Sequence, residues 1–132
     1  MSAIASAGTA ARYALGGIRV LNGALGLVAP AVIIRRLGDR APATNAAAYY
    51  GIRLFGVRTI VLGADLFLLR GRELEGALRS AVLIHGSDTS TVLSLWRRRQ
   101  LPPDLARPLA LISGLNTALA VTAFLSRRRA GS

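Results

Sequence analysis

Two side chains of the sequence could transfer a proton, those of His85 and Asp88. On a helix, their spacing of three residues places both side chains on one face. There the carboxylate would stabilise the protonated form of the imidazole, the one side chain that ordinarily titrates near neutral pH. We therefore take His85 and Asp88 as candidate catalytic residues. The alternative interpretation is that the two groups only satisfy each other's hydrogen bonds.

Four further polar residues interrupt apolar stretches and are candidate ligand-binding residues: Arg19, Arg53, Arg58 and Asn116. A guanidinium can hold an oxyanion or a carbonyl oxygen, so Arg58 would suit a ligand whose proton is moved by His85. The alternative is that the arginines form ion pairs inside the protein. Both interpretations require the segments around these residues to come together.

The composition excludes several kinds of site and partner. The chain has 132 residues and no cysteine, which excludes disulfides, thiol nucleophiles and cysteine-based metal sites, and its one histidine cannot form a cluster. We therefore expect no metal. The net charge of +11 would suit nucleic acid, but the arginines form short clusters between long apolar stretches, and only 5% of the residues are aromatic. Cationic clusters that flank apolar segments are typical of membrane proteins, so we expect no nucleic-acid partner.

Four segments predict membrane-spanning helices, at residues 13–34, 46–69, 80–96 and 108–125. A bilayer core of about 30 Å requires about 20 mainly apolar residues in a helix. The predicted fold is all-α, a four-helix transmembrane bundle with up-down-up-down topology. Residues 1–12 would form an extended or loosely helical lead-in, residues 13–126 the four-span membrane domain, and residues 127–132 a basic C-terminal tail.

The third of these segments is the least apolar, because residues 85–91 include no large hydrophobic side chain. Such a segment inserts poorly alone but is tolerated in a bundle, where protein covers most of its sides. A broken or re-entrant segment buried in protein is the alternative. For the whole chain the alternative is a soluble four-helix bundle, which is disfavoured because residues 13–34 and 108–125 lack a continuous polar face.

Charges inside the expected spans require partners, since each costs about 2.5–3.5 kcal/mol near the centre of a membrane helix. The helical rise places Arg58 near the depth of Asp88, and Arg19 near the depth of Asp65 or Asp88. We expect ion pairs among these residues. Arg53 lies closer to the opposite surface, where its side chain could extend into the headgroups.

Glycines accompany the charges of the first two expected spans. In lipid, small residues let helix backbones approach closely and bring polar groups together. Two stripes therefore predict a tight helix pair with a polar interior: Arg19, Asn22, Gly23 and Gly26 on the first helix, and Arg53, Gly56, Thr59 and Gly63 on the second.

The arginines leave the orientation in the membrane open. Seven of them would lie at each end of the bundle, and the positive-inside rule counts only basic residues. Both surfaces should attract anionic lipid headgroups. We expect a multi-pass protein of the cell membrane (inner or plasma membrane), with the lipid bilayer as its first partner and another membrane protein or a second copy of the chain as a further partner.

Residues 50–58, Tyr-Gly-Ile-Arg-Leu-Phe-Gly-Val-Arg, resemble the second helix of small four-span DoxX-like membrane proteins, which carries an Arg-x-Phe-Gly-x-Arg pattern followed by a glycine, here Gly63. The stretch from His85 to Asp88 is similar to a polar His-x-x-Asp stretch in their third span. The resemblance extends over residues 13–125 and implies the four-span fold. It implies a link to quinone chemistry by analogy only, because the namesake of the family resembles a membrane subunit that accompanies thiosulfate:quinone oxidation.

Two functions of different classes follow. The first is a small integral membrane protein without catalytic activity, acting as an accessory subunit of a membrane complex. The alternative is a membrane-embedded enzyme or binding protein that uses Arg58, His85 and Asp88 on a lipophilic or quinone-like ligand. A ligand cavity around these three residues would favour the alternative, and tight packing with paired charges would favour the first. Apart from a quinone, which only the resemblance implies, no cofactor is expected.

Overall fold

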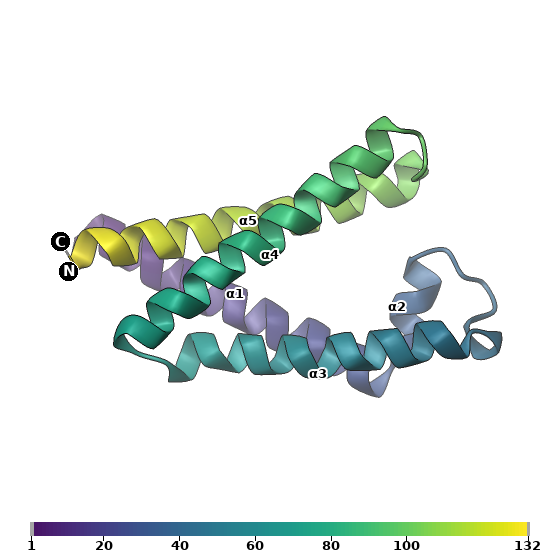
Figure 1. The fold of residues 1–132 in the computed structure, drawn as a ribbon, viewed down its shortest axis with the longest axis horizontal. Coiled ribbons are helices and arrows are strands. Elements are labelled where there is room, and N and C mark those ends of the chain that lie inside the picture. Colours follow the sequence, from purple (N-terminus) through teal and green to yellow (C-terminus); the bar gives the residue numbers. More distant parts are fainter. Residues whose placement is uncertain (1, 132) are drawn as a thin grey trace. The chain divides into compact units, whose positions relative to one another are not determined.

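A computed structural model describes residues 2–131 of the chain, and the elements of this described part are all helices, without a strand (Figure 1). The predicted all-α class is confirmed. The elements are α1 (Ala3–Val28), α2 (Pro30–Arg36), the 3-10 turn η1 (Pro42–Thr44), α3 (Ala46–Leu68), α4 (Gly71–Arg97) and α5 (Pro103–Ala130). They fall into two compact units, Met1–Leu15 with Leu68–Ser132, and Gly16–Phe67.

Helix boundaries differ from the expected spans mainly where charged residues occur. The lead-in is helical, because α1 already begins at Ala3, and α5 continues through the three arginines of the expected tail to Ala130. The charged residues 72–79, expected to precede the third span, form the first turns of α4. A charged residue near the end of a helix can reach solvent while its backbone stays helical. The change from apolar to charged residues therefore did not coincide with the ends of these helices.

The unit Gly16–Phe67 contains a sharp bend that the apolar pattern did not predict. Residues 13–34 are not one helix, since α1 ends at Val28 and α2 leaves it at an angle of 104° (Figure 1). Pro30 explains the break, because the ring of a proline disfavours helical backbone in the residue before it. Ala29 accordingly has φ −133° and ψ 59°, outside the helical region.

Within this unit, glycines bring the backbones of α1 and α3 into contact. A Cβ atom on Gly23 would lie 2.7 Å from the carbonyl oxygen of Gly56, and a Cβ on Gly56 would lie 2.7 Å from that of Gly23. Gly63 lies equally close to Arg19, where its Cβ would meet the Arg19 Cβ at 2.8 Å. The predicted tight pairing of the two glycine stripes is therefore confirmed.

The interior of this helix pair is less polar than predicted. Arg19 is buried, with 3% of its surface exposed, but Asn22 and Arg53 are exposed. Gly56 and Gly63 lie at the centre of the α3 face that contacts α1. At about 100° of rotation per residue, Arg53 lies at the edge of this face. Its side chain therefore leaves the interface.

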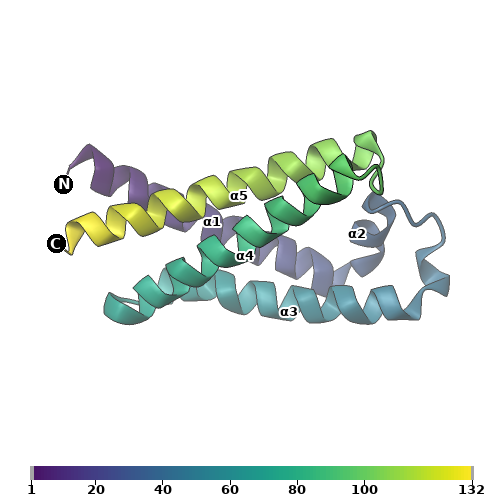
Figure 2. The ribbon, with the colours of Figure 1, turned by 45° about the horizontal axis from the view of Figure 1, so that its top comes forward.

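The other unit is built on an antiparallel pair, α4 and α5, with the first half of α1 beside it (Figures 1 and 2). Gly71, with φ +55°, ends the short turn after α3, and the left-handed conformation suits glycine. Near the chain ends Gly8 lies against Ser126, so that a Cβ on Gly8 would overlap the Ser126 side chain. This contact joins the start of α1 to the end of α5.

A hydrogen-bonded loop connects α2 to α3. Asp39 Oδ1 accepts the Ala41 amide at 2.9 Å, and Oδ2 accepts the Asn45 side-chain amide at 3.0 Å. Asn45 Oδ1 in turn accepts the Ala48 amide at 3.0 Å, which caps the N-terminus of α3. The bonds from Asn45 and then from Ala41 lower the pKa of the Asp39 carboxyl, because they stabilise its ionised form.

We predict that Gly23→Ala and Gly56→Ala each lower the free energy of unfolding by about 1–3 kcal/mol, since the added methyl group must push two backbones apart. Gly17→Ala and Gly51→Ala are matched controls on the same two helices, because no atom lies within 4 Å of their Cβ positions. In the controls the free energy of unfolding should rise by about 0.5–1 kcal/mol, because alanine favours the helix over glycine. Denaturant unfolding followed by circular dichroism measures both, and equal effects in the two pairs would contradict the close contact.

The loop should lose its order in acid. Because the folded-state pKa of Asp39 is lowered, its bonds stabilise the loop above the ordinary aspartate pKa of about 3.9, and this stabilisation disappears as the pH falls through the folded-state value. Amide-exchange protection of Ala41 and Ala48 should fall over that range, and Asp39→Ala should abolish the pH dependence. The Leu37 amide, bonded to the Ile33 carbonyl, is the internal control.

Candidate functional site

His85 and Asp88 lie together on α4, as their spacing predicted. Nδ1 of His85 is 3.5 Å from Oδ2 of Asp88, an ion-pair distance when the imidazole is protonated. The His85 side chain is 9% exposed and that of Asp88 is 57% exposed. The carboxylate therefore connects a buried imidazole with the surface of the chain, which is the arrangement needed to pass a proton in or out.

One turn further along α4, two hydroxyl groups join α4 to α5. Thr89 Oγ1 lies 2.9 Å from Thr117 Oγ1, and each threonine is also within reach of a carbonyl on its own helix, His85 O at 3.0 Å and Ser113 O at 2.8 Å. Two hydroxyls supply only two hydrogens for these three contacts. One threonine therefore donates to the other, which donates to its own carbonyl, and the direction can reverse without moving a heavy atom.

Asn116 is buried on α5 and keeps one polar atom unsatisfied. The residue is 8% exposed, and within residues 2–131 its Oδ1 atom has no hydrogen-bond partner. A buried amide oxygen without a partner costs about 1–3 kcal/mol. Asn116 is therefore the ligand-binding candidate whose environment leaves an acceptor available.

The candidate arginines occupy the unit Gly16–Phe67. Arg19 is buried and its Nη1 donates to the Leu62 carbonyl at 3.2 Å, whereas Arg53 and Arg58 are exposed. The candidates on α4 and α5 belong to the other unit. The expected pairing of Arg58 with Asp88 would join the two units and stays a prediction.

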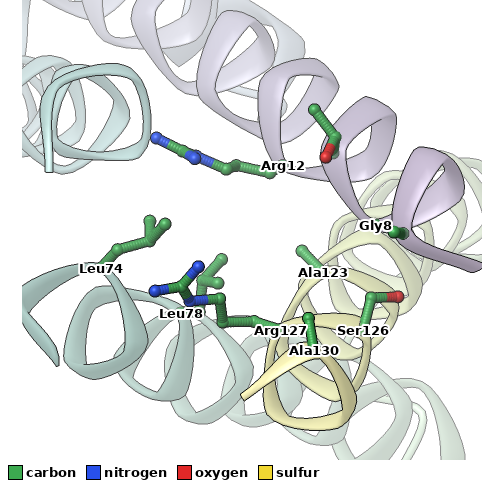
Figure 3. A pocket seen from close by; sticks show the side chains of 10 residues that line it. Gly8, Arg12, Leu74, Leu78, Ala123, Ser126, Arg127 and Ala130 are labelled. Carbon is green, nitrogen blue, oxygen red and sulfur yellow. The ribbon is translucent and has the colours of Figure 1, made fainter. Parts of the chain in front are cut away.

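A cavity that the sequence analysis missed lies within the unit of α4, α5 and the first half of α1 (Figure 3). Its volume is about 220 Å³. Arginines from two helices, Arg12 of α1 and Arg127 of α5, line it, and Leu74 and Leu78 of α4 form an apolar wall.

Helical spacing could have revealed this cavity. Its lining residues follow the spacing i, i+3, i+4, i+7 on two helices: Ala5, Gly8, Thr9 and Arg12 on α1, and Ala123, Ser126, Arg127 and Ala130 on α5. Such a set occupies one face of a helix. The apolar pattern does not indicate this cavity, because residues 1–12 and 127–132 lie outside the expected spans, in the lead-in and the tail.

Asn116→Leu tests the unsatisfied amide. Leucine branches at the same carbon as asparagine and brings no polar atom, so we predict a free energy of unfolding raised by about 1 kcal/mol. Asn116→Asp, which buries a charge, should lower it by more than that. Thermal unfolding of the purified protein measures both. A loss of stability in Asn116→Leu comparable to that in Asn116→Asp would show that the amide has a structural partner.

Comparison of the chain with protein-family models, with curated proteins and with solved structures gave no match. The resemblance to DoxX-like proteins accordingly stays a proposal, which rests on residues 50–58 and on His85 with Asp88. The function has to be argued from the geometry of the helices themselves.

Proposed function

We propose that the chain is a small multi-pass integral membrane protein of the DoxX-like kind, a four-helix transmembrane bundle that serves as an accessory subunit of a membrane complex. The observation that carries the proposal is the distribution of side chains on α5 and, in part, on α3: these helices bury mainly small and polar residues and expose many large apolar ones. Lipid as the surrounding solvent explains this distribution, because bulky apolar side chains then gain nothing from burial.

Helix α5 shows the distribution most clearly. Its exposed large side chains are all aliphatic: Leu111, Ile112, Leu115 and Leu125. Its buried residues are all small or polar: Ala106, Ser113, Asn116, Ala120, Ala123 and Ser126. In water the hydrophobic effect would favour the reverse arrangement.

Helix α3 carries a second exposed apolar face. Tyr50, Leu54, Val57, Val61 and Leu68 recur at helical spacing and are exposed by 36–74% of their surface. On the face toward α1 lie Gly56 and Gly63, both buried. The buried residues of α3 are these two glycines and Leu66, so the helix presents most of its large residues outward, as α5 presents its leucines outward and its alanines inward.

Length and hydropathy support the proposal for part of the chain. Among the described residues, α5 alone is by itself long and apolar enough to cross a bilayer, and α1 with α2 would add a second crossing only as a strongly bent pair. Only 22% of the most apolar window of α5 is buried in the protein, which is unlike the core helix of a soluble domain. Helices α3 and α4 carry more charged or polar residues and would cross as members of the bundle.

The accessory role is supported by the exposed polar face of α4. Ser87, Ser90, Thr91 and Ser94 are all exposed on this helix. Lipid offers hydroxyl groups no hydrogen-bond partner, whereas a neighbouring helix does, and small side chains permit close approach. A helix of another membrane protein, or a second copy of this chain, would cover this face.

The second candidate function is a membrane-embedded enzyme or binding protein for a lipophilic or quinone-like ligand. The contact between His85 and Asp88 favours it, because the pair could move a proton to or from a bound carbonyl. Asn116 would supply a hydrogen-bonding group from the facing helix.

Because the chain contains no cysteine, single cysteines can be introduced without altering the background. We predict that Leu111→Cys and Leu115→Cys on α5, and Val57→Cys and Val61→Cys on α3, react with a membrane-impermeant maleimide about tenfold or more slowly than Asp104→Cys in intact membranes. The thiolate is the reactive form, and lipid suppresses it. Solubilisation and denaturation should make all five react alike.

Rapid labelling of all five cysteines in membranes would refute the membrane proposal, because the apolar faces would then contact water. Protection on α5 with free labelling on α3 would leave a single crossing and refute the multi-pass arrangement. Separately, cross-linking through Ser94→Cys to another protein or to a second copy would identify the partner of α4.

A further inference from the structure

We propose that the cavity between α1, α4 and α5 binds a phosphate group, carried by an anionic lipid headgroup or by a free anion. The lipid source rests on the membrane location proposed above, whereas the free anion does not. All residues that line the cavity belong to one compact unit, and Figure 3 shows the guanidinium groups of Arg12 and Arg127 entering it from two helices.

Two arginines, Arg12 and Arg127, line this cavity, and Arg70 is bonded beside Arg12. Nη2 of Arg12 and Nη1 of Arg70 both donate to the carbonyl oxygen of Leu69, at 3.1 and 2.8 Å, so one acceptor holds the two guanidinium groups together. Burial lowers the pKa of Arg12 most, Tyr13 acts in the opposite direction, and the nearby charges of Arg70 and Arg127 lower the pKa further. A bound anion would relieve the repulsion between these charges.

The packing of α1 against α5 holds the arginines in place. Gly8 touches Ser126 directly, and Arg12 and Arg127 follow one turn and one residue later on their helices. The Arg12 side chain is further held by the face of the Tyr13 ring, 4.9 Å from the guanidinium carbon to the ring centroid. The Arg12 guanidinium is therefore held in place before any ligand binds, which lowers the entropy cost of binding.

The chemistry of the lining suits phosphate. Guanidinium groups bind phosphate through paired, charge-assisted hydrogen bonds, and the hydroxyl-bearing residues Thr9 and Ser126 are among the lining residues. The volume of about 220 Å³ lies below the roughly 300–1,000 Å³ of pockets that enclose drug-sized ligands. A quinone-like ring system is therefore a poorer fit than a phosphate group.

The apolar wall favours a lipid as the carrier of the phosphate. Leu74, Leu78 and Ala123 line the same cavity as the arginines, so a ligand with a charged end and an apolar remainder would satisfy both surfaces. The neighbouring hollow is lined by Arg72, Arg127 and Arg128 with one acid, Glu75. At this end of the unit, arginines outnumber acids, and the surrounding field attracts anions.

The test measures thermal unfolding of the full chain in dodecyl maltoside micelles during titration with phosphatidylglycerol, phosphatidylcholine or inorganic phosphate at constant ionic strength. We expect phosphatidylglycerol to raise the unfolding midpoint and phosphatidylcholine to leave it unchanged. The apparent affinity should fall about fivefold in Arg127→Gln and about 30-fold in Arg12→Gln/Arg127→Gln, since each arginine near an anionic surface contributes about that factor. Arg97→Gln/Arg98→Gln removes the same charge at the other end of α4 and should change it less than about twofold.

Stabilisation by inorganic phosphate alone, lost in Arg127→Gln, would support the phosphate site with a free anion as ligand, even if cysteine labelling refuted the membrane location. Equal stabilisation of the wild type and Arg12→Gln/Arg127→Gln would overturn the proposal. A loss in Arg97→Gln/Arg98→Gln as large as in the cavity variant would also overturn it, because the effect would then be one of net charge. Should Arg12→Gln fail to fold, Arg127→Gln decides, since Arg127 is exposed at the end of α5.

Discussion

Small residues at the helix contacts set the distance between backbones, and this distance decides which side chains are buried. Where Gly23 meets Gly56 the main chains themselves are in contact, and where Gly8 meets Ser126 a main chain contacts a small side chain, so neither contact leaves room for a large side chain. Several large apolar residues of the same helices, such as Leu21, Val61 and Leu111, are exposed, whereas Leu15 and Leu66 are fully buried. Close backbone packing therefore acts together with a small apolar core.

Several polar side chains, of which Arg19 is buried and the others half-buried or exposed, bond to main-chain carbonyl oxygens. Arg19 donates to the carbonyl oxygen of Leu62, and Arg12 and Arg70 donate to that of Leu69. On α4 and α5, the hydroxyl groups of Thr89 and Thr117 lie within hydrogen-bond distance of each other and of carbonyls on their own helices, and their two hydrogens make two of these three bonds. Main-chain carbonyl oxygens therefore act as acceptors for side chains in both units.

The functional proposals rest on the few polar groups that are not fully engaged in these helix contacts. The carboxylate of Asp88 links His85 to the surface, and the amide oxygen of Asn116 lacks a partner within residues 2–131. Arg12 on α1 and Arg127 near the end of α5 line a small cavity, although Arg127 was expected to lie in a basic tail. His85 with Asp88 is the proposed proton-transfer pair, Asn116 offers a hydrogen-bond acceptor, and the arginines form the proposed anion site.

The sequence by itself determined the features that depend on spacing along one helix. The all-α class, the shared face of His85 and Asp88 and the glycine stripes of α1 and α3 all follow from the 3.6-residue period, which is a local property. Tertiary structure alone decided which faces meet: it exposed Arg53, left the amide of Asn116 unsatisfied and brought Arg12 to Arg127. Those outcomes depend on the rotation and separation of whole helices, and because these are set by the sum of many weak contacts, no single motif encodes them.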